Sequence, residues 1–505
     1  MADKGTGMGR IDRADGQADS PHAADFFGTF RATLTEGDPV AAVQYGLIGK
    51  GMAISGPFGP RTMLYADYTA SGRALRQIEE AMLDGVLPFY ANSHTEASWC
   101  GAHMTALRRA ARALIARACG ADDAHAVLFT GAGATAGLNR LVHLFGLPEA
   151  VAQGARPVVL LGPYEHHSNI LPWRESGAEV RVLPEGPRGG PDLDALDAAL
   201  AEVAGRPVVG SFAAASNVTG HMADVAAVTR RLKAAGALSV WDYATAAPYV
   251  PMSMTPAPDA AIDAVVISPH KFTGGPGASG ITVLRRDAVR RATPVWPGGG
   301  TVRFVSPCGH DYAGSLEARE EAGTPNLVGD IRAALVFAVK EAVGTDRMAE
   351  RHAALAAQAL AAWKDEPHLD LLGMPDGARL PIFAFRVRDG AGGWLHPQLV
   401  TRLLSDVHGI QARGGCACAG PYVHDLLGID AEASDRLRAQ ILAGNEIEKP
   451  GFTRLNLSWT LTDDEAARLI DGVRDIARRG VDLARGYAPD PRTAIFRPLA
   501  PAAGG

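Results

Sequence analysis

The sequence has little cysteine, no long hydrophobic run and no long run of basic residues. Five cysteines in 505 residues are too few to build a disulfide framework, so we expect a reducing, cytoplasmic setting. No apolar run reaches the roughly 18 residues that a membrane span requires, and the polar start lacks the apolar stretch of a secretory signal. With a net charge of −6 and no basic tract, neither nucleic acid nor a membrane is expected as a partner.

The chain does contain enough apolar sequence for a large core. Hydrophobic residues make up 47% and charged residues 21% of it, as in globular proteins. Short apolar runs alternate with helical patterns, and the runs are continuous, which is typical of strands buried on both faces. Strands separated by helices favour a mostly parallel sheet. We predict an α/β fold whose seven strands are Ala126–Thr130, Pro157–Gly162, Ala178–Leu183, Pro207–Phe212, Leu238–Asp242, Ala264–Ser268 and Gly280–Leu284.

The pattern changes after about residue 330, which predicts a second unit. Long alanine-rich helices lead there to further apolar runs. A capping box at Thr462–Glu465 opens an amphipathic helix that we expect to end at Gly480. The predicted organisation is a flexible N-terminal arm over 1–25, a large domain over 26–340, a small α+β domain over 341–485 and a tail over 486–505.

The predicted strand ends carry the side chains of a cofactor site. In open α/β sheets, ligands bind beyond the carboxyl ends of the strands. Asp242 ends one predicted strand and Lys271 follows the next, while His166 and Asn217 follow two others. A fifth strand runs into a glycine-containing turn and a helix. One edge of the sheet therefore offers a carboxylate, an amine, an imidazole, an amide and a phosphate-type loop.

These side chains suit pyridoxal phosphate. Lys271 would hold the cofactor as a Schiff base, and Asp242 would keep its pyridine nitrogen protonated so that the ring acts as an electron sink. His166 would stack on the ring, and Asn217 would hydrogen-bond the ring hydroxyl. A phosphate needs N–H groups at a helix start together with hydroxyls, and the candidates here are Ala134 and Thr135, helped by Ser268 and His270.

The glycine-containing turn also allows a nicotinamide site. Gly131, Gly133 and Gly137 form a G-x-G-x-x-x-G pattern between a strand and a helix. Glu149 follows at roughly the distance of a ribose-binding acid. This spacing departs from the strict dinucleotide pattern, and no separate set of residues suggests hydride transfer.

A second cluster, at 411–421, combines an arginine with two cysteines. Arg413 could form a bidentate pair with a substrate carboxylate, and a glycine-rich loop could carry a reactive thiol. Cys416, Cys418 and His424 could instead bind zinc, but no second cysteine pair follows, and we predict no metal. The two cysteines could also be buried structural residues.

Several motifs resemble those of fold-type I pyridoxal-phosphate enzymes of the class V aminotransferase group. The resemblance is closest to cysteine desulfurases, selenocysteine lyases and molybdenum cofactor sulfurases, and it covers about residues 60–480. The motifs are YADYTASG (65–72), YEHHSNILPW (164–173), SNVTG (216–220), DYAT (242–245), SPHKFTGGPG (268–277), GGGT (298–301), EAGTPN (321–326) and RGGCACAGP (413–421).

The resemblance implies the catalytic residues. His166 would be the stacking histidine and Lys271 the Schiff-base lysine. Arg413 would fall on the arginine that binds the substrate carboxylate, and Cys418 on the cysteine that forms a persulfide. Cys416 falls on a position that usually holds another residue type.

The resemblance also implies further contacts. Thr245 would contact the cofactor at the position where the family has glutamine. Ser71 and Asn326 would lie at the substrate site. Thr301 would reach into the phosphate site of the neighbouring subunit, which implies a homodimer with shared sites. The residue after the phosphate-site threonine is Ala136, where the family usually has glutamate.

These observations lead to one main hypothesis and two alternatives. The main hypothesis is an enzyme that takes sulfur from L-cysteine, leaving alanine and a persulfide on Cys418 for transfer to an acceptor protein. The first alternative is the same cofactor used for transamination, epimerisation or C–S lysis of another amino acid, since a fold does not fix a reaction. The second, a non-enzymatic interaction protein, fits poorly with the intact Lys271, Asp242 and His166.

Overall fold

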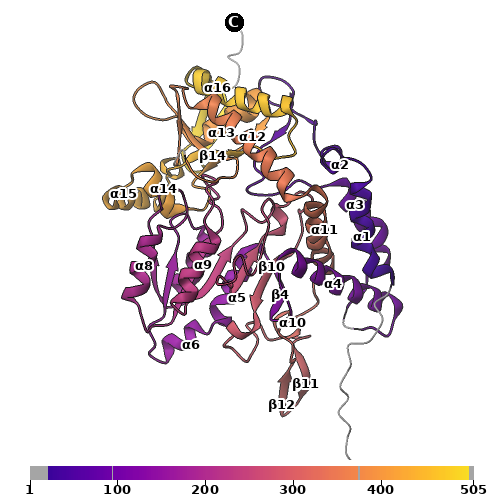
Figure 1. Ribbon diagram of the computed structural model, residues 1–505. Helices are drawn as coiled ribbons and strands as arrows, with labels where there is room; N and C mark the ends of the chain where they lie inside the picture. The colour runs from indigo at the N-terminus through magenta and orange to yellow at the C-terminus, as the bar shows by residue number, and fades with distance from the viewer. Residues whose placement is uncertain (1–20, 94, 374–375, 500–505) are drawn as a thin grey trace, which may run out of the picture.

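The computed structural model describes residues 21–93, 95–373 and 376–499. It contains a large unit built on a seven-stranded sheet and a small unit built on a four-stranded sheet, each with its own hydrophobic core. The small unit lies above the large one in the view of Figure 1.

The seven-stranded sheet confirms the predicted α/β fold. Its strand order is β4-β10-β9-β8-β7-β5-β6, and all strands except β10 run in the same direction. Each predicted strand is present, with ends that differ by no more than one residue. The strands are β4 (His125–Gly131), β5 (Val158–Leu161), β6 (Glu179–Val182), β7 (Val208–Ala213), β8 (Leu238–Asp242), β9 (Ala264–Ile267) and β10 (Gly280–Arg285).

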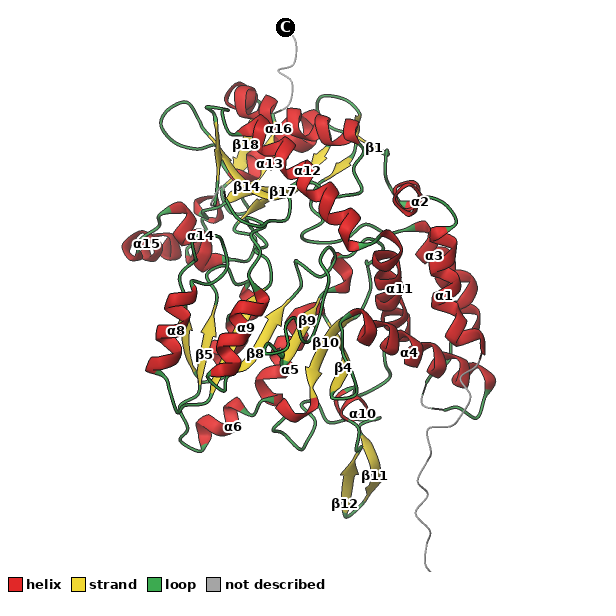
Figure 2. Ribbon diagram, in the orientation of Figure 1, coloured by secondary structure: helices red, strands yellow, loops and turns green. Residues whose placement is uncertain are grey.

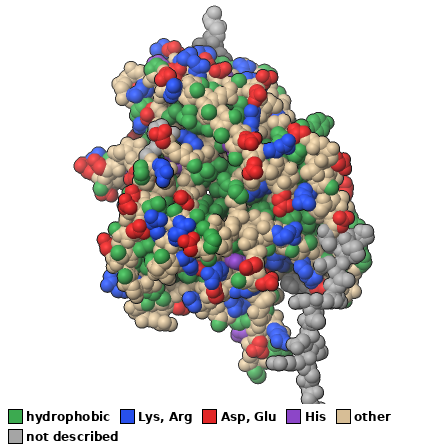
Figure 3. Space-filling view, in the orientation of Figure 1, with side chains coloured by type: hydrophobic (Ala, Val, Ile, Leu, Met, Phe, Trp, Pro, Cys, Tyr) green, Lys and Arg blue, Asp and Glu red, His purple; other side chains and the backbone are tan. Residues whose placement is uncertain are grey.

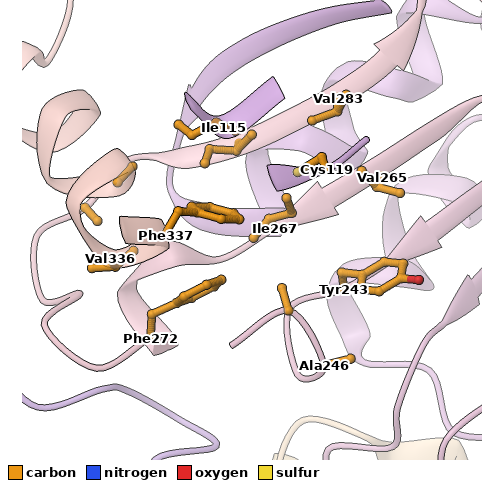
Figure 4. Close-up of a cluster of buried hydrophobic side chains, with 14 of the residues drawn as sticks. Ile115, Cys119, Tyr243, Ala246, Val265, Ile267, Phe272, Val283, Val336 and Phe337 are labelled. Atoms are coloured by element: carbon orange, nitrogen blue, oxygen red, sulfur yellow. The ribbon is translucent and has the colours of Figure 1, made fainter. Parts of the chain in front are cut away.

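Helices cover both faces of this sheet, which explains why its strands are continuously apolar. Figure 4 shows part of one face, where Phe337 and Ile115 lie near Val265, Ile267 and Val283. The helices on that face are α4 (Trp99–Ala118), α8 (Leu193–Glu202), α9 (Val225–Ala234) and α11 (Leu327–Val343). The opposite face is covered by α5 (Gly133–Leu144) and α7 (Leu171–Glu175).

The small unit packs three helices on an antiparallel sheet of order β13-β14-β17-β16. The predicted capping box is confirmed at the start of its last helix, where Thr462 and Glu465 bond each other's backbone N–H groups. The strands are β13 (Leu369–Leu371), β14 (Ile382–Val387), β16 (Arg413–Gly415) and β17 (Phe452–Asn456), and the helices are α12 (Thr345–Trp363), α13 (Pro397–His408) and α16 (Asp463–Ala484).

A segment from the N-terminal part of the chain belongs to the small unit. Strand β3 (Leu64–Tyr65) pairs in parallel with β15 (Ile410–Gln411). Leu64 and Ala66 are buried in the core of the small unit, although they lie within the range expected for the large domain. The domain limits otherwise stay a prediction.

Three expectations about the ends of elements need correction. Helix α1 begins at Pro21, inside the predicted arm, whose first 20 residues lie outside the described residues. The predicted tail forms a hairpin of β18 (Tyr487–Asp490) and β19 (Ile495–Pro498), because Tyr487 and Phe496 are buried in the core of the small unit. Helix α16 continues past Gly480 to Ala484, because the glycine serves close packing there and does not end the helix: a Cβ at Gly480 would lie 2.9 Å from Leu395 Cδ1.

The remaining elements surround the two units. Figure 2 shows a hairpin of β11 (Val302–Ser306) and β12 (Gly309–Tyr312) that projects from the large unit at the bottom of the view. The other helices are α2 (Pro39–Gly46), α3 (Arg76–Gly85), α6 (Leu147–Ala152), α10 (Leu316–Glu320), α14 (Gly420–Leu427) and α15 (Ala431–Leu442).

The surface shows no segregation of charge on the face seen in Figure 3, where acidic and basic side chains are interspersed. Within residues 21–93, 95–373 and 376–499, none of the helices has both the length and the apolar character needed to cross a membrane.

Candidate active site

A cavity opens where the carboxyl ends of β5, β7, β8 and β9 meet the loops of the small unit. The structure brings most of the predicted site residues to this cavity, although they come from distant parts of the sequence. Those lining it are Ala134, Thr135, His166, Asn217, Asp242, Thr245, Ser268, His270, Lys271, Arg413 and Cys418.

Lys271 is held by a short 3-10 turn, η3 (Pro269–Lys271), that follows β9. Gly72 fixes this turn, because its N–H donates to His270 O (2.9 Å) and a Cβ at Gly72 would overlap the backbone of Phe272, the residue that follows the turn. Burial lowers the pKa of Lys271 to about 8, while the charge of Asp242 opposes that shift. An amine with such a pKa has a substantial neutral fraction near pH 7, as a nucleophile needs.

Asp242 ends β8 and is buried at the floor of the cavity. Its carboxylate accepts the Ala244 N–H (2.8 Å). Burial raises the pKa of Asp242, and the charge of Lys271 opposes this rise. Asp242 and Lys271 line the same cavity. Their carboxyl and amine are the groups that would bind the protonated pyridine nitrogen and the aldehyde of pyridoxal phosphate.

Two histidines of the cavity are held in the neutral form. His166 precedes η2 (His167–Asn169), and its Nδ1 accepts the Ser168 N–H (3.1 Å), which leaves the ring proton on Nε2. Burial, followed by the charge of Lys271, lowers the pKa of His166 and that of His270 to about 4. Flat, neutral rings of this kind suit stacking and hydrogen bonding on a cofactor.

A buried polar network that sequence analysis did not single out begins at Glu165, the residue before His166. Glu165 accepts the Ala213 N–H (2.8 Å) and Asn169 Nδ2–H (2.6 Å). Asn169 Oδ1 accepts Trp173 Nε1–H (2.9 Å) and Ser211 Oγ–H (2.6 Å). Burial raises the pKa of Glu165 to about 8. The spacing E-x-x-x-N-x-x-x-W was visible in the sequence, but only the fold shows that these side chains meet.

The start of α5 forms the candidate phosphate cradle. Gly133 has a positive φ of 59°, and a Cβ there would lie 2.8 Å from Ser268 Oγ. The Ala134 N–H donates to the same hydroxyl (3.0 Å), and Thr135 Oγ1 lies 2.7 Å from Ser168 Oγ. Backbone N–H groups and hydroxyls at the start of a helix are the donors that an anion needs.

The cysteine loop after β16 is fixed against the large unit. Ala417 and Cys418 have positive φ values of 47° and 56°, which residues with a Cβ rarely adopt. Asn217 Nδ2–H donates to Ala417 O (2.8 Å), and the His167 N–H donates to Cys418 O (2.8 Å). Cys418 is exposed and lines the cavity, while Cys416 is half-buried. Asn217 thus holds this loop, and its expected contact with the cofactor ring hydroxyl stays a prediction.

Two arginines form the far wall of the site, and an aspartate outside the cavity lining holds both of them. Arg413 on β16 and Arg454 on β17 both line the cavity, and both bond Asp67. The distances are 3.0 Å from Arg413 Nε to Asp67 Oδ2 and 2.7 Å from Arg454 Nη2 to Asp67 Oδ1. Arg413 was predicted. Asp67 lies within the quoted motif YADYTASG, but neither Asp67 nor Arg454 was singled out.

Three predicted residues do not line this cavity. The segment 65–72 contributes Thr69 and Ala70 to the wall, whereas Ser71 Oγ–H donates to a backbone carbonyl. Asn326 caps α11 by accepting a backbone N–H (3.2 Å). Thr301 is buried, and its hydroxyl donates to Gly298 O (2.7 Å). Its expected role in a partner's site stays a prediction.

The alternative binding sites receive no support from the geometry. Glu149, the candidate ribose-binding acid of the nicotinamide alternative, pairs with Arg291 (2.7 Å) and does not line the cavity. His424 is 2.8 Å from Gly420 O and 3.0 Å from Ser434 Oγ through its two ring nitrogens. Among the described residues, no three His, Cys, Asp or Glu side chains form a group that could hold a metal ion.

Comparison with protein families and curated sequences gives concordant results. The family model described as aminotransferase class-V matches residues 64–448. A cysteine desulfurase of Enterobacter sp. (strain 638) is 30% identical over 420 residues, which cover 82% of this chain and 93% of the relative. A probable cysteine desulfurase of Streptomyces coelicolor is 27% identical over 71% of this chain and 84% of the relative.

Solved structures show the same fold. The apo structure of a cysteine desulfurase from Thermococcus onnurineus NA1 matches with a TM-score of 0.67 at 23% identity, covering 82% of this chain and 95% of that one. The Escherichia coli cysteine desulfurase CsdA matches with a TM-score of 0.66 at 23% identity, covering 82% and 94%. These neighbours confirm the expected fold-type I architecture.

Proposed function

The chain belongs to the class-V aminotransferase family, and we propose that it is a pyridoxal-phosphate-dependent cysteine desulfurase. It would take the sulfur of L-cysteine, release alanine and leave a persulfide on Cys418. One observation carries the proposal: Lys271, Arg413 and the thiol of Cys418 line a single cavity. The names of the curated relatives support the same activity.

The cavity residues fit the cofactor. Lys271 would hold it through Nζ, and the buried carboxyl of Asp242 would bind its protonated pyridine nitrogen. The start of α5, with Ser268, would take the phosphate, and His166 would stack on the ring. When bound, pyridoxal phosphate supplies an electron sink for bonds to the α-carbon of an amino acid.

The chain's own residues then supply binding and proton transfer. Arg413 binds the substrate carboxylate through its guanidinium. Lys271 Nζ, with its lowered pKa, accepts and returns a proton, and the neutral His166 carries one at Nε2.

Sulfur transfer falls to Cys418. Its thiolate bonds to the substrate sulfur while the carbon–sulfur bond breaks, and the electron pair stays on carbon. A proton on that carbon completes alanine, so the reaction needs no outside oxidant or reductant. The hydrogen bonds from Asn217 and His167 hold the loop at the cavity wall.

The test is anaerobic incubation of the cofactor-loaded protein with L-cysteine, with alanine measured by mass spectrometry. Cys418→Ala should abolish alanine formation while the cofactor absorbance persists. Cys416→Ala, on the same loop, is the matched control and should retain activity. Undiminished alanine from Cys418→Ala would contradict the persulfide role. An inactive wild type whose cofactor still responds to other amino acids would favour transamination, epimerisation or lysis of another substrate.

The proposed assembly is a cytoplasmic homodimer that passes sulfur to an acceptor protein. The side chains of Trp296, Phe304 and Val305, around the projecting hairpin, are more than half exposed, as in a surface that a second subunit covers. Thr301 lies at the base of this hairpin and would serve the partner's phosphate site. Light scattering of the holoenzyme tests the assembly, and a monomer at micromolar concentration would contradict it.

A further inference from the structure

Two arginines of the cavity face each other across a strand pair. The register of β16 and β17 places Arg413 directly opposite Arg454. Like charges at opposite positions repel each other, and Arg454 is almost fully buried, with 4% of its side chain exposed. The pair therefore needs a counter-charge, and Asp67 supplies it through ion pairs of 3.0 and 2.7 Å.

Asp67 provides this charge from behind the cavity wall. Both arginines line the cavity, whereas Asp67 does not. The backbone next to it is fixed, because the Ala66 N–H donates to Gln411 O (3.0 Å) and Ala66 O accepts the Asn456 N–H (2.9 Å). The aspartate is thus built into the small unit, and the arginines keep their cavity-facing surface for a ligand.

The net charge at this wall of the cavity determines how many carboxylates of a ligand it can neutralise. Two guanidiniums and one carboxylate leave one positive charge on this wall. The other charged pair of the cavity, Lys271 and Asp242, is assigned to the cofactor. His166 and His270 are neutral above about pH 5, because burial lowers the pKa of both to about 4. Among the described cavity residues, no further cation is available for a second carboxylate.

We propose that Asp67 is a specificity-determining residue that restricts this site to α-amino acids with a single carboxylate. One substrate carboxylate would neutralise the wall, while a dicarboxylate would bring a negative charge that has no partner. The inference rests on the proposed function only in taking an amino acid as the ligand. It applies to whichever reaction follows binding.

The experiment compares L-alanine with L-aspartate, which differ by one carboxylate. Their affinities for the holoenzyme are measured by calorimetry and by the change in cofactor absorbance, without turnover. The wild type should favour L-alanine. Asp67→Asn removes the charge and should shift the affinity ratio toward L-aspartate by about tenfold or more, because close charge pairs at binding sites contribute that much.

The controls separate charge from structure. Asp67→Glu restores the charge and should restore the wild-type ratio. Asp370→Asn removes an aspartate that pairs with Arg386 (2.6 Å) outside the cavity, and should leave the ratio unchanged. If Asp67→Asn fails to bind the cofactor, Asp67→Ser, which removes the same charge, must show the shift instead.

An unchanged ratio in a folded charge-removing variant would overturn the inference, as would an equal loss of both affinities. Failure of the proposed function would give another result: no alanine would form from L-cysteine, while the affinity ratio could still shift in Asp67→Asn as predicted. Conversely, normal alanine production from L-cysteine, with an affinity ratio that Asp67→Asn leaves unchanged, would contradict the role of Asp67 but not the proposed function.

Discussion

The lowered pKa of Lys271 predicts how the apo-protein captures its cofactor. Only the neutral amine attacks an aldehyde, and burial lowers its pKa from 10.5 to about 8. At pH 7 the neutral fraction is then about 10%, roughly 300 times that of an ordinary lysine. The fraction rises with pH until the pKa is passed. We therefore expect the capture rate to rise from pH 6 and to level off above about pH 9.

The assay follows the absorbance of the lysine-bound cofactor after rapid mixing with pyridoxal phosphate at each pH. Lys271→Ala must show no signal, and Lys233→Ala, which removes a lysine paired with Asp263 (2.7 Å), should match the wild type. Asp242→Asn removes the charge that opposes the shift, so its midpoint should fall below that of the wild type. A rate that still rises tenfold per pH unit up to pH 10 would refute this account.

Three further predictions concern positions around the site and far from it. Gly72→Ala should impair cofactor loading, measured by absorbance, because its Cβ would overlap the backbone of Phe272, directly after Lys271. Gly37→Ala is its control, because a Cβ at Gly37 would have no neighbour within 4 Å. Trp173→Phe removes a buried hydrogen bond to Asn169 and should cost about 1–3 kcal/mol in urea unfolding, and an unchanged midpoint would contradict the network. Thr462→Ala breaks the capping box of α16 and should cost about 1 kcal/mol with unchanged turnover, so a loss of activity would show that the cap affects the site.

The sequence predicted the sheet and the cofactor side of the cavity well, for a physical reason. Strands buried on both faces leave continuous apolar runs, and their carboxyl ends meet at one edge. Asp242 and Lys271 could therefore be placed together without knowing any tertiary contact. The family resemblance added Arg413 and Cys418, which local patterns alone left open.

The features that the sequence did not predict arise from contacts between segments that are distant in the chain. Asp67 meets Arg454 only because β3 joins the small unit, and no local periodicity signals that pairing. The tail looked unstructured because its prolines and glycines suggest loops, yet Tyr487 and Phe496 anchor it as a hairpin. Gly480 suggested a helix end where the chain instead needs close packing against Leu395.

The pairing of β3 with β15 has a consequence for biosynthesis. The paired residues Leu64 and Ile410 are more than 300 positions apart. Strand β3 therefore stays without its partner strand during synthesis until most of the chain has left the ribosome. The core of the small unit, which includes Leu64 and Ala66, therefore closes after translation is nearly complete. A fragment that begins after residue 340 would lack this strand and expose the edge of β15 to aggregation.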